Sequence, residues 1–422
     1  LRGQDGLVLE ERSALGEPIL VGDFLKRPPQ KGRDLVLTLD RAVQFVLAQR
    51  LEEGVKKYGA ESGTVIVLNP TTGEIISLAN YPRYDPALPQ ERDEVLVVEN
   101  KDEEEEDNKE DKNDEDKEKN DEEGELEETE QQETKYPAQR RNLAIASSYE
   151  PGSVIKALTM AAAINEGKVT PQTTFVSKPL SVGNHVIRTW DNKYYGESTM
   201  VEVLERSDNT GAAWVALEKL GKRTLREYFT RFGLGEKTGI DLEGEAAGIL
   251  KPLSQWHNID LANASFGQGL SATPLQVLSA FSVFANEGVL MSPYFVREIR
   301  DNGKTITFSP QKERRVLSKH TAKVMEGMLT KAAEHGEASF FVLKDWKVAG
   351  KTGTAQIPVG GKYDPHKTNT TFVGFLPESK KFVMLVKLEK PSTSTYAAET
   401  AVPLWMEMAK ELIRYYSIPP DR

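Results

Sequence analysis

The hydrophobic and polar positions of this 422-residue chain predict strands at both ends and helices in the middle. Residues 41–58 carry apolar side chains at helical spacing, and residues 63–79 form two short β runs around a turn, the pattern of a hairpin. A final helix is predicted over residues 397–415. Three further β runs are predicted in the C-terminal part, at residues 346–355, 371–376 and 382–388. Because the chain leaves a sheet, builds helices and returns to strands, this order predicts an α+β fold.

Three other segments complete the predicted architecture. Residues 1–33 are rich in glycine and proline, which favours short strands and turns. Residues 154–166 form an alanine-rich run with few polar side chains, the pattern of a buried helix. Residues 274–288 begin with a proline and place leucine and phenylalanine at helical spacing, so we interpret them as a core helix rather than a cofactor site.

A serine and a lysine stand at the start of the predicted helix over residues 154–166. The string Ser153-Val-Ile-Lys156 follows a turn signal, so the serine meets free backbone N–H groups and the positive end of the helix dipole, which favour a developing oxyanion. Lys156 lies one helical turn further on, on the same face. A serine hydroxyl needs a base to take its proton, and a buried lysine can lose its charge and serve as that base.

The same spacing occurs again at Ser309-Pro-Gln-Lys312, which shows that the motif alone decides little. The proline and the charged residues 311–315 predict an exposed turn at the second copy. Such a string is ordinarily non-catalytic, a serine at a helix start with a solvated lysine. We favour Ser153 as the nucleophile because it stands between a turn signal and a predicted buried helix, whereas Ser309 stands in a predicted exposed turn.

Ser207-Asp-Asn209 is the only Ser-x-Asn string in the chain. It falls between predicted helices at residues 198–206 and 211–220, so Ser207 and Asn209 are expected to project from a rigid connection into a cleft. The alternative is an ordinary helix cap.

A Lys-Thr-Gly string at residues 351–353 lies in an extended stretch of small residues, where a ligand can approach a strand edge. A second copy at residues 237–239 falls in a glycine-punctuated loop, so we favour Lys351 as the functional lysine. A Walker A phosphate loop is excluded, because it requires glycine where the chain has Asp345.

In this order the three strings match the SxxK, SxN and KTG set of serine acyl-transfer enzymes that bind penicillin. The chain resembles the class B penicillin-binding proteins, the monofunctional peptidoglycan D,D-transpeptidases of cell division and elongation. The resemblance covers nearly all of the chain outside one insert. It rests on matches at residues 1–6, 34–40, 69–73, 149–153, 265–269, 273–276 and 350–355. It implies the penicillin-binding transpeptidase fold, a five-stranded antiparallel sheet flanked by helices, with the active site between the sheet and a helical subdomain.

The resemblance implies a role for each matching residue. Ser153 attacks the D-Ala-D-Ala amide of a stem peptide, and neutral Lys156 takes the serine proton. Ser207, with Lys351 nearby, relays a proton to the leaving D-alanine. The substrate-binding residues are Asn209, which binds the amide side chain, Thr352 and Thr354, which hold the terminal carboxylate against Lys351, and Gly353 between them. The backbone N–H groups of Ser153 and Thr354 form the oxyanion hole.

The amine of a neighbouring stem peptide then attacks the acyl-enzyme, and β-lactams mimic D-Ala-D-Ala and leave Ser153 acylated. Further implied partners are a SEDS-family glycosyltransferase and divisome or elongasome proteins. Two alternatives stay open: hydrolysis, as a D,D-carboxypeptidase or β-lactamase-type enzyme, and a catalytically idle scaffold that recruits division or elongation proteins.

The resemblance also implies the domain organisation. Residues 1–33 end an N-terminal pedestal of the dimerisation type, residues 34–417 form the transpeptidase domain, and residues 418–422 are a tail. Members of the family carry one N-terminal transmembrane helix and hold the catalytic domain outside the bacterial cytoplasm. Because residues 1–6 already match the middle of the family pattern, we expect pedestal and anchor to precede this sequence.

The net negative charge of the chain comes from one segment. Residues 99–135 contain 21 Asp or Glu and 6 Lys, a local net charge of −15 within a chain of −11, so the remainder carries +4. Nearly devoid of aromatic and branched residues, the segment predicts an acidic, disordered insert over residues 93–136. A calcium loop is disfavoured, because its sixth position is Asp116 instead of glycine. An electrostatic gate near the cleft is an alternative function for the insert.

No metal, cofactor or nucleic acid is predicted. The chain has no cysteine, which excludes thiolate sites and disulfides. No HExxH or paired spacing connects its five histidines, His185, His257, His320, His335 and His366.

Overall fold

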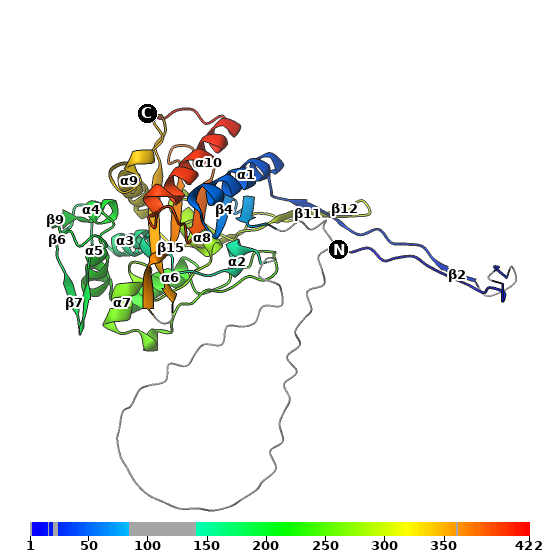
Figure 1. Ribbon diagram of the computed structural model, residues 1–422, viewed down its shortest axis with the longest axis horizontal. Helices are drawn as coiled ribbons and strands as arrows, with labels where there is room; N and C mark the ends of the chain where they lie inside the picture. The colour runs from blue at the N-terminus through cyan, green and yellow to red at the C-terminus, as the bar shows by residue number, and fades with distance from the viewer. Residues whose placement is uncertain (1, 16, 20–23, 84–140, 360–361) are drawn as a thin grey trace, which may run out of the picture. The chain divides into compact units, whose positions relative to one another are not determined.

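A five-stranded antiparallel sheet organises the protein (Figure 1). The computed structural model describes residues 2–15, 17–19, 24–83, 141–359 and 362–422, and the acidic insert expected at residues 93–136 lies outside them. The strands follow the order β14-β15-β16-β4-β5. Their bounds are Ala349–Val359 (β14), Lys362–Phe375 (β15), Val383–Glu389 (β16), Ser62–Leu68 (β4) and Ile75–Tyr81 (β5). The predicted hairpin and the three predicted C-terminal strands are therefore confirmed, and β14, which carries Lys351, is an edge strand.

Alternating side chains of the sheet face two separate hydrophobic cores, as the period of two requires. On one face, Val65 and Val67 of β4 pack with helices α1 (Arg41–Tyr58) and α10 (Ala401–Tyr415). On the other face, Ile66 and neighbouring apolar residues pack with helix α8 (Pro274–Ala285) and the helical region. Every residue of α8 is buried, which confirms the predicted core helix.

The helical region lies between β5 and β14 in the sequence and surrounds α8. Its helices are α2 (Leu143–Ala146), α3 (Ile155–Asn165), α4 (Met200–Glu205), α5 (Asn209–Trp214), α6 (Gly221–Arg231), α7 (Asn258–Ala264) and α9 (Lys319–His335). A 3-10 turn, Gly152–Val154, precedes α3, and a π-helical segment, Val215–Leu220, joins α5 to α6. The predicted helices are present, but α5 begins at Asn209 rather than Gly211, because the Asp208 side chain accepts hydrogen bonds from the first turn.

Short strands surround this framework. Within residues 1–33, the expected short strands are β1 (Leu7–Glu10) and β2 (Phe24–Arg27), which pair with each other. The remaining strands are β3 (Asp34–Leu37), β6 (Thr174–Ser177), β7 (Leu180–Val182), β8 (His185–Ile187), β9 (Gly196–Thr199), β10 (Val289–Met291), β11 (Val296–Asp301), β12 (Lys304–Thr307) and β13 (Lys312–Arg315). Among the described helices, none is both long and apolar enough to span a membrane.

Candidate active site

The serine of the first string is held on a tightly packed segment before α3. Ser153 is half-buried in the 3-10 turn Gly152–Val154, and Gly152 has a positive φ of 58°. The Gly152 N–H donates to the Gly267 carbonyl at 3.2 Å, and a Cβ on Gly267 would collide with the backbone of Gly152. Glycine at both positions thus lets two chain segments touch behind the nucleophile and fix its backbone.

Lys156 fills the space directly beneath the serine. Its side chain is buried, with 1% of the residue exposed. Its Nζ donates to Ser153 Oγ at 2.8 Å, to the Ser207 carbonyl at 2.5 Å and to Ser207 Oγ at 3.1 Å. Burial and the positive charge of Lys351 lower the pKa of Lys156 well below its usual value of 10.5. The arrangement therefore favours a neutral amine, as a base for the serine requires.

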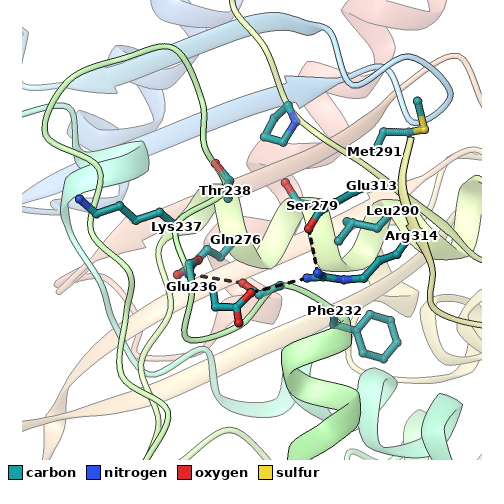
Figure 2. A pocket seen from close by; sticks show the side chains of 12 residues that line it. Phe232, Glu236, Lys237, Thr238, Gln276, Ser279, Leu290, Met291, Glu313 and Arg314 are labelled. Carbon is teal, nitrogen blue, oxygen red and sulfur yellow. Dashed lines mark hydrogen bonds and ion pairs between the residues drawn. The ribbon is translucent and has the colours of Figure 1, made fainter. Parts of the chain in front are cut away.

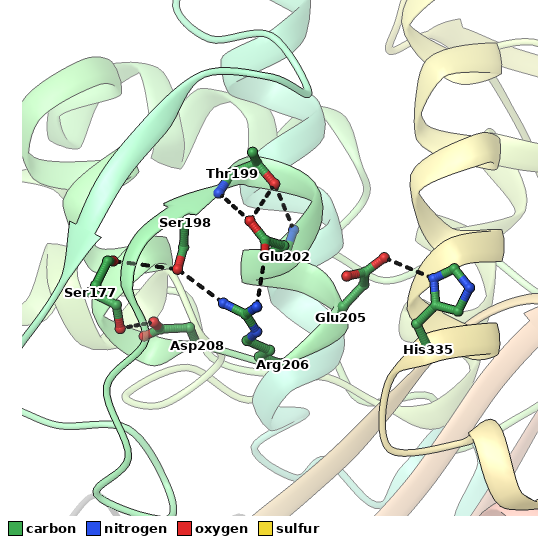
Figure 3. A network of polar contacts seen from close by, with 9 residues as sticks. Ser177, Ser198, Thr199, Glu202, Glu205, Arg206, Asp208 and His335 are labelled. Carbon is green, nitrogen blue, oxygen red and sulfur yellow. Dashed lines mark hydrogen bonds and ion pairs between the residues drawn. The ribbon is translucent and has the colours of Figure 1, made fainter.

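The second string turns the corner between α4 and α5. Ser207 is buried and has a positive φ of 54°, a sparsely populated conformation for a residue with a side chain. Asp208 holds the corner. Its carboxylate accepts from the Thr210 N–H at 2.7 Å. It also accepts from Ser177 Oγ at 2.6 Å (Figure 3). The Asn209 amide donates to the Arg188 carbonyl at 3.1 Å. Asn209 is the first residue of α5, because the Asp208 side chain caps this helix, and it does not lie in the connection between α4 and α5 as expected.

The third string lies on edge strand β14, facing the corner. Lys351 is 3% exposed, and its Nζ donates to Ser207 Oγ and to Thr352 Oγ1, both at 3.0 Å. Burial lowers the pKa of Lys351, although the charge of Glu337 opposes the shift. Thr354 is only half-buried, and its Oγ1 accepts from the Ala397 N–H at 3.1 Å.

Gly353 brings β14 against the segment that carries Ser153. A Cβ on this glycine would lie 2.7 Å from the Pro151 carbonyl oxygen and 2.9 Å from Val154 Cγ2. The strand can approach the segment closely only because the side chain is missing. The packing of Gly353 against residues 151–154 is a structural role, and its predicted place among the substrate-binding residues stays a prediction.

The four residues expected to be catalytic are thus joined by hydrogen bonds, from Ser153 through Lys156 and Ser207 to Lys351. Such a chain can move a proton from the serine to a leaving group while the charge stays distributed over two amines. The structure thus brings together Ser153, Lys156, Ser207, Lys351 and Thr352, whereas the side chains of Asn209 and Thr354 hydrogen-bond to the Arg188 carbonyl and the Ala397 N–H.

Three residues of the site have no role in the sequence-based interpretation. Glu337 accepts a hydrogen bond from Thr352 Oγ1 at 2.6 Å, Ser177 supports Asp208, and Gly267 supports Gly152. Glu337 and Ser177 lie on segments outside the three strings and carry no spacing signal. Gly267 lies in the string at residues 265–269 that matches the family. Of these three residues, it is therefore the one that the sequence could have marked as important.

The second copies of two strings lie in other surroundings. Ser309 is exposed in an irregular segment, and Lys312 is exposed on strand β13. Lys237 is exposed on a loop beside a small cavity lined by Gln276 and Arg314 among others (Figure 2). The neighbouring Thr238 donates to Glu245 through Oγ1 at 2.5 Å. The exposure predicted at Ser309 and the loop predicted at residues 237–239 are confirmed, but the turn predicted over residues 311–315 is wrong, because residues 312–315 form strand β13 and pair with β10.

No group of three or more His, Cys, Asp or Glu residues that could hold a metal is found in the part of the chain that the structure describes. The functional groups of the site are hydroxyls, amines, one amide, the carboxylates of Asp208 and Glu337, and backbone N–H groups.

Comparison with known proteins agrees with this geometry. Residues 63–408 match the penicillin binding protein transpeptidase domain, and the chain belongs to this family, in its class B branch. Stage V sporulation protein D of Bacillus subtilis is 31% identical over 431 residues, which cover 100% of this chain and 60% of that protein. The chain therefore spans less than two thirds of the length of this relative. A probable peptidoglycan D,D-transpeptidase PenA of Neisseria flavescens is 28% identical over 430 residues, which cover 100% of this chain and 93% of that protein.

Solved structures show the same fold. Penicillin binding protein 3 of Mycobacterium tuberculosis in its apo form superposes with a TM-score of 0.78 and 25% identity, over 94% of this chain and 82% of that one. The same protein complexed with ampicillin superposes with a TM-score of 0.77 and 26% identity, over 94% of this chain and 81% of that one. The predicted α+β penicillin-binding transpeptidase fold is confirmed.

Proposed function

We propose that this chain is a serine-type D,D-transpeptidase that cross-links peptidoglycan stem peptides and is acylated by β-lactams. One observation carries the proposal: Ser153 Oγ receives a hydrogen bond from a buried lysine whose pKa is lowered, at the start of a helix. A serine with a neutral amine at 2.8 Å has the base that nucleophilic attack on an amide requires. The name of the Neisseria relative and the ampicillin complex of the Mycobacterium protein support the same chemistry.

The proton follows the hydrogen bonds of the site. Lys156 takes the proton of Ser153 as its Oγ attacks the carbonyl carbon of D-Ala-D-Ala. When the tetrahedral intermediate collapses, Ser207 delivers a proton to the nitrogen of the leaving D-alanine and is reprotonated from the two amines, Lys156 at 3.1 Å and Lys351 at 3.0 Å. The amine of a second stem peptide then attacks the acyl carbon and forms the cross-link; the ester bond to Ser153 breaks, and the proton that the amine loses returns to Ser153 Oγ through Lys156.

The walls of the cleft supply the substrate contacts. Asn209 binds the amide side of the substrate, and Thr352 and Thr354 on β14 hold its terminal carboxylate beside Lys351. The backbone N–H groups of Ser153 and Thr354 form the oxyanion hole, where loss of one donor typically costs on the order of a hundredfold in rate. Gly353 keeps β14 close enough for both walls to contact one substrate.

Location of a penicillin adduct tests the proposal. The chain is incubated with a fluorescent penicillin, digested with protease, and the labelled peptide is identified by mass spectrometry. We expect the adduct on Ser153. An adduct on another residue, or no adduct, contradicts the proposal.

The lifetime of the same adduct separates the proposal from hydrolysis. A transpeptidase keeps the label for many minutes, whereas a β-lactamase or carboxypeptidase transfers the acyl group rapidly to water. Rapid loss of label in buffer would favour the hydrolase. An idle scaffold would support growth with the variant Ser153→Ala, which a transpeptidase does not.

The setting of the domain belongs to the same proposal. Residues 1–33 end a pedestal, residues 34–417 form the transpeptidase domain with the acidic insert at residues 93–136, and residues 418–422 form the tail. The full protein is held at the bacterial membrane by an N-terminal anchor and works with a SEDS-family glycosyltransferase in the divisome or elongasome. Co-purification of that glycosyltransferase with the full-length protein tests this assembly.

A further inference from the structure

We infer that Glu337 is a positioning residue of the active site, which orients Thr352 and holds the positive charge of Lys351 in place; the inference rests on the proposed function. Glu337 lies directly after helix α9, outside the three strings. Its effect on the reaction passes through Thr352 and Lys351.

The contacts make Glu337 the last member of the chain of hydrogen bonds. Glu337 Oε2 accepts from Thr352 Oγ1 at 2.6 Å, and the same Oγ1 accepts from Lys351 Nζ at 3.0 Å. Because a hydroxyl has one proton, the bond to Glu337 turns the oxygen lone pairs of Thr352 toward the lysine. Lys351 is thereby directed to Ser207 on one side and to Thr352 on the other.

The segment that carries Glu337 is fixed against the corner that carries Ser207. A Cβ on Gly336 would collide with the carbonyl oxygen of Glu205, so the backbones touch at this glycine. The His335 ring nitrogen Nδ1 and Glu205 Oε1 lie 3.2 Å apart, and Figure 3 shows this pair between α9 and α4. Glu337 follows this contact directly, and Ser207 follows Glu205 by two residues. The carboxylate is therefore held on a packed turn and not on a free loop.

Electrostatics gives the carboxylate a second effect. Two buried amines lie on the same hydroxyl, and their like charges oppose each other. The ionisable groups of the site are Lys156 on α3, Lys351 on β14, Asp208 before α5 and Glu337 after α9. The charge of Glu337 raises the pKa of both lysines, against the larger effect of burial. Since Glu337 reaches Lys351 through a single hydroxyl, it favours the proton on Lys351 and leaves Lys156 as the neutral base.

The geometry also divides the work between the two threonines of β14. Thr352 donates its proton to Glu337. Thr354 Oγ1 accepts from the Ala397 N–H, which leaves its own proton for a ligand. Thr354 therefore has a proton to donate to the substrate carboxylate, and Thr352 contributes to holding that carboxylate through the position that it gives Lys351.

Three variants test the inference. Glu337→Gln keeps an acceptor for Thr352 and removes the charge, and Glu337→Ala removes both. Glu334→Gln is the matched control, because Glu334 lies on the same helix end and pairs with Arg422 instead of the site. The readout is the rate constant of acylation by a fluorescent penicillin over a range of pH, with the thermal unfolding midpoint as a measure of folding.

Without the negative charge, the pKa of both lysines falls further. We therefore expect both limbs of the pH profile to move to lower pH in Glu337→Gln. In Glu337→Ala we expect the same displacement and in addition a loss of about tenfold in rate, the size of one lost hydrogen bond to a charged group. Glu334→Gln keeps the wild-type profile. A wild-type profile in Glu337→Gln, or an equal displacement in Glu334→Gln, overturns the inference.

A second readout does not depend on acylation. Lysines labelled with ¹³C at Cε are titrated by NMR, and the two buried amines are assigned with the variants Lys156→Met and Lys351→Met. Both titrations move to lower pH in Glu337→Gln if the inference holds, and stay in place if it fails. Absence of penicillin labelling in the wild type would contradict the proposed function, whereas unmoved titrations would contradict the role of Glu337.

Discussion

The chain carries the string Lys-Thr-Gly twice; the threonine of each copy donates to a glutamate, but the two lysines differ in burial and in their contacts. At residues 351–353 the lysine is buried on an edge strand, with its amine on Ser207 Oγ. At residues 237–239 the lysine is exposed on a loop, and the threonine binds Glu245. The two SxxK strings differ in the same way, since Lys156 is buried under Ser153 while Lys312 is exposed on a strand.

This contrast indicates that the lysine of such a motif must be buried before it can serve as a base. A lysine in water keeps its proton at neutral pH and cannot serve as a base, whereas burial against a second amine favours the neutral form. A threonine beside a lysine matters only where both face a cleft. The proposed chemistry therefore requires the buried copies, and each copy in solvent is an internal control for its buried counterpart.

The largest effect is expected at the two serines. Ser153→Ala removes the hydroxyl oxygen, just before α3, to which Lys156 donates, so we expect labelling by penicillin to be lost completely. Ser309→Ala changes an exposed hydroxyl and leaves labelling unchanged. Labelling is measured by gel fluorescence at equal protein concentration. Loss of label in both variants, or in neither, would remove the distinction between the copies.

The two lysines of the Lys-Thr-Gly strings come next. Lys351→Met keeps the length of the side chain and removes the amine that donates to Ser207, so we expect the acylation rate constant to fall by about a hundredfold or more, as for other groups that stabilise developing charge. Lys237→Met is expected to keep the wild-type rate. Stopped-flow acylation with a chromogenic β-lactam measures both, and equal rates would contradict the assignment of Lys351.

The pH dependence follows from the direction of the two pKa shifts. The rate rises with pH as Lys156 loses its proton, about tenfold for each pH unit below its pKa, and this limb lies well below 10.5. The rate falls again at higher pH when Lys351 loses the charge that the reaction uses, also below 10.5. Lys237→Met is expected to retain both limbs. A rate that keeps rising up to pH 10.5 would show that neither lysine is shifted.

Much of this site could be predicted from the sequence, because its elements are local. The start of a helix at Ser153 and an extended edge at Lys351 leave signals in neighbouring residues, such as the preceding turn and the run of small residues. Contacts between distant segments leave no such signal. Glu337 meets Thr352 only because α9 ends beside β14, and Asn209 joined the helix because the aspartate before it caps the first turn. The insert at residues 93–136 and the division into pedestal and transpeptidase domain remain predictions.

The glycines of the two Lys-Thr-Gly strings separate stability from activity. In Gly353→Ala the new methyl group would meet the Pro151 carbonyl oxygen and force β14 away from the segment that carries Ser153, which costs about 1–3 kcal/mol in the free energy of unfolding. In Gly239→Ala no atom outside the adjoining residues lies within 4 Å, but a φ of 74° costs a residue with a side chain about 1–2 kcal/mol. Denaturant unfolding is therefore expected to find similar losses of stability. The acylation rate should nevertheless fall severalfold in Gly353→Ala and stay unchanged in Gly239→Ala, because of the two glycines only Gly353 lies between β14 and the segment of Ser153. An equal fall in Gly239→Ala would mean that the rate depends on stability and not on the geometry of the cleft.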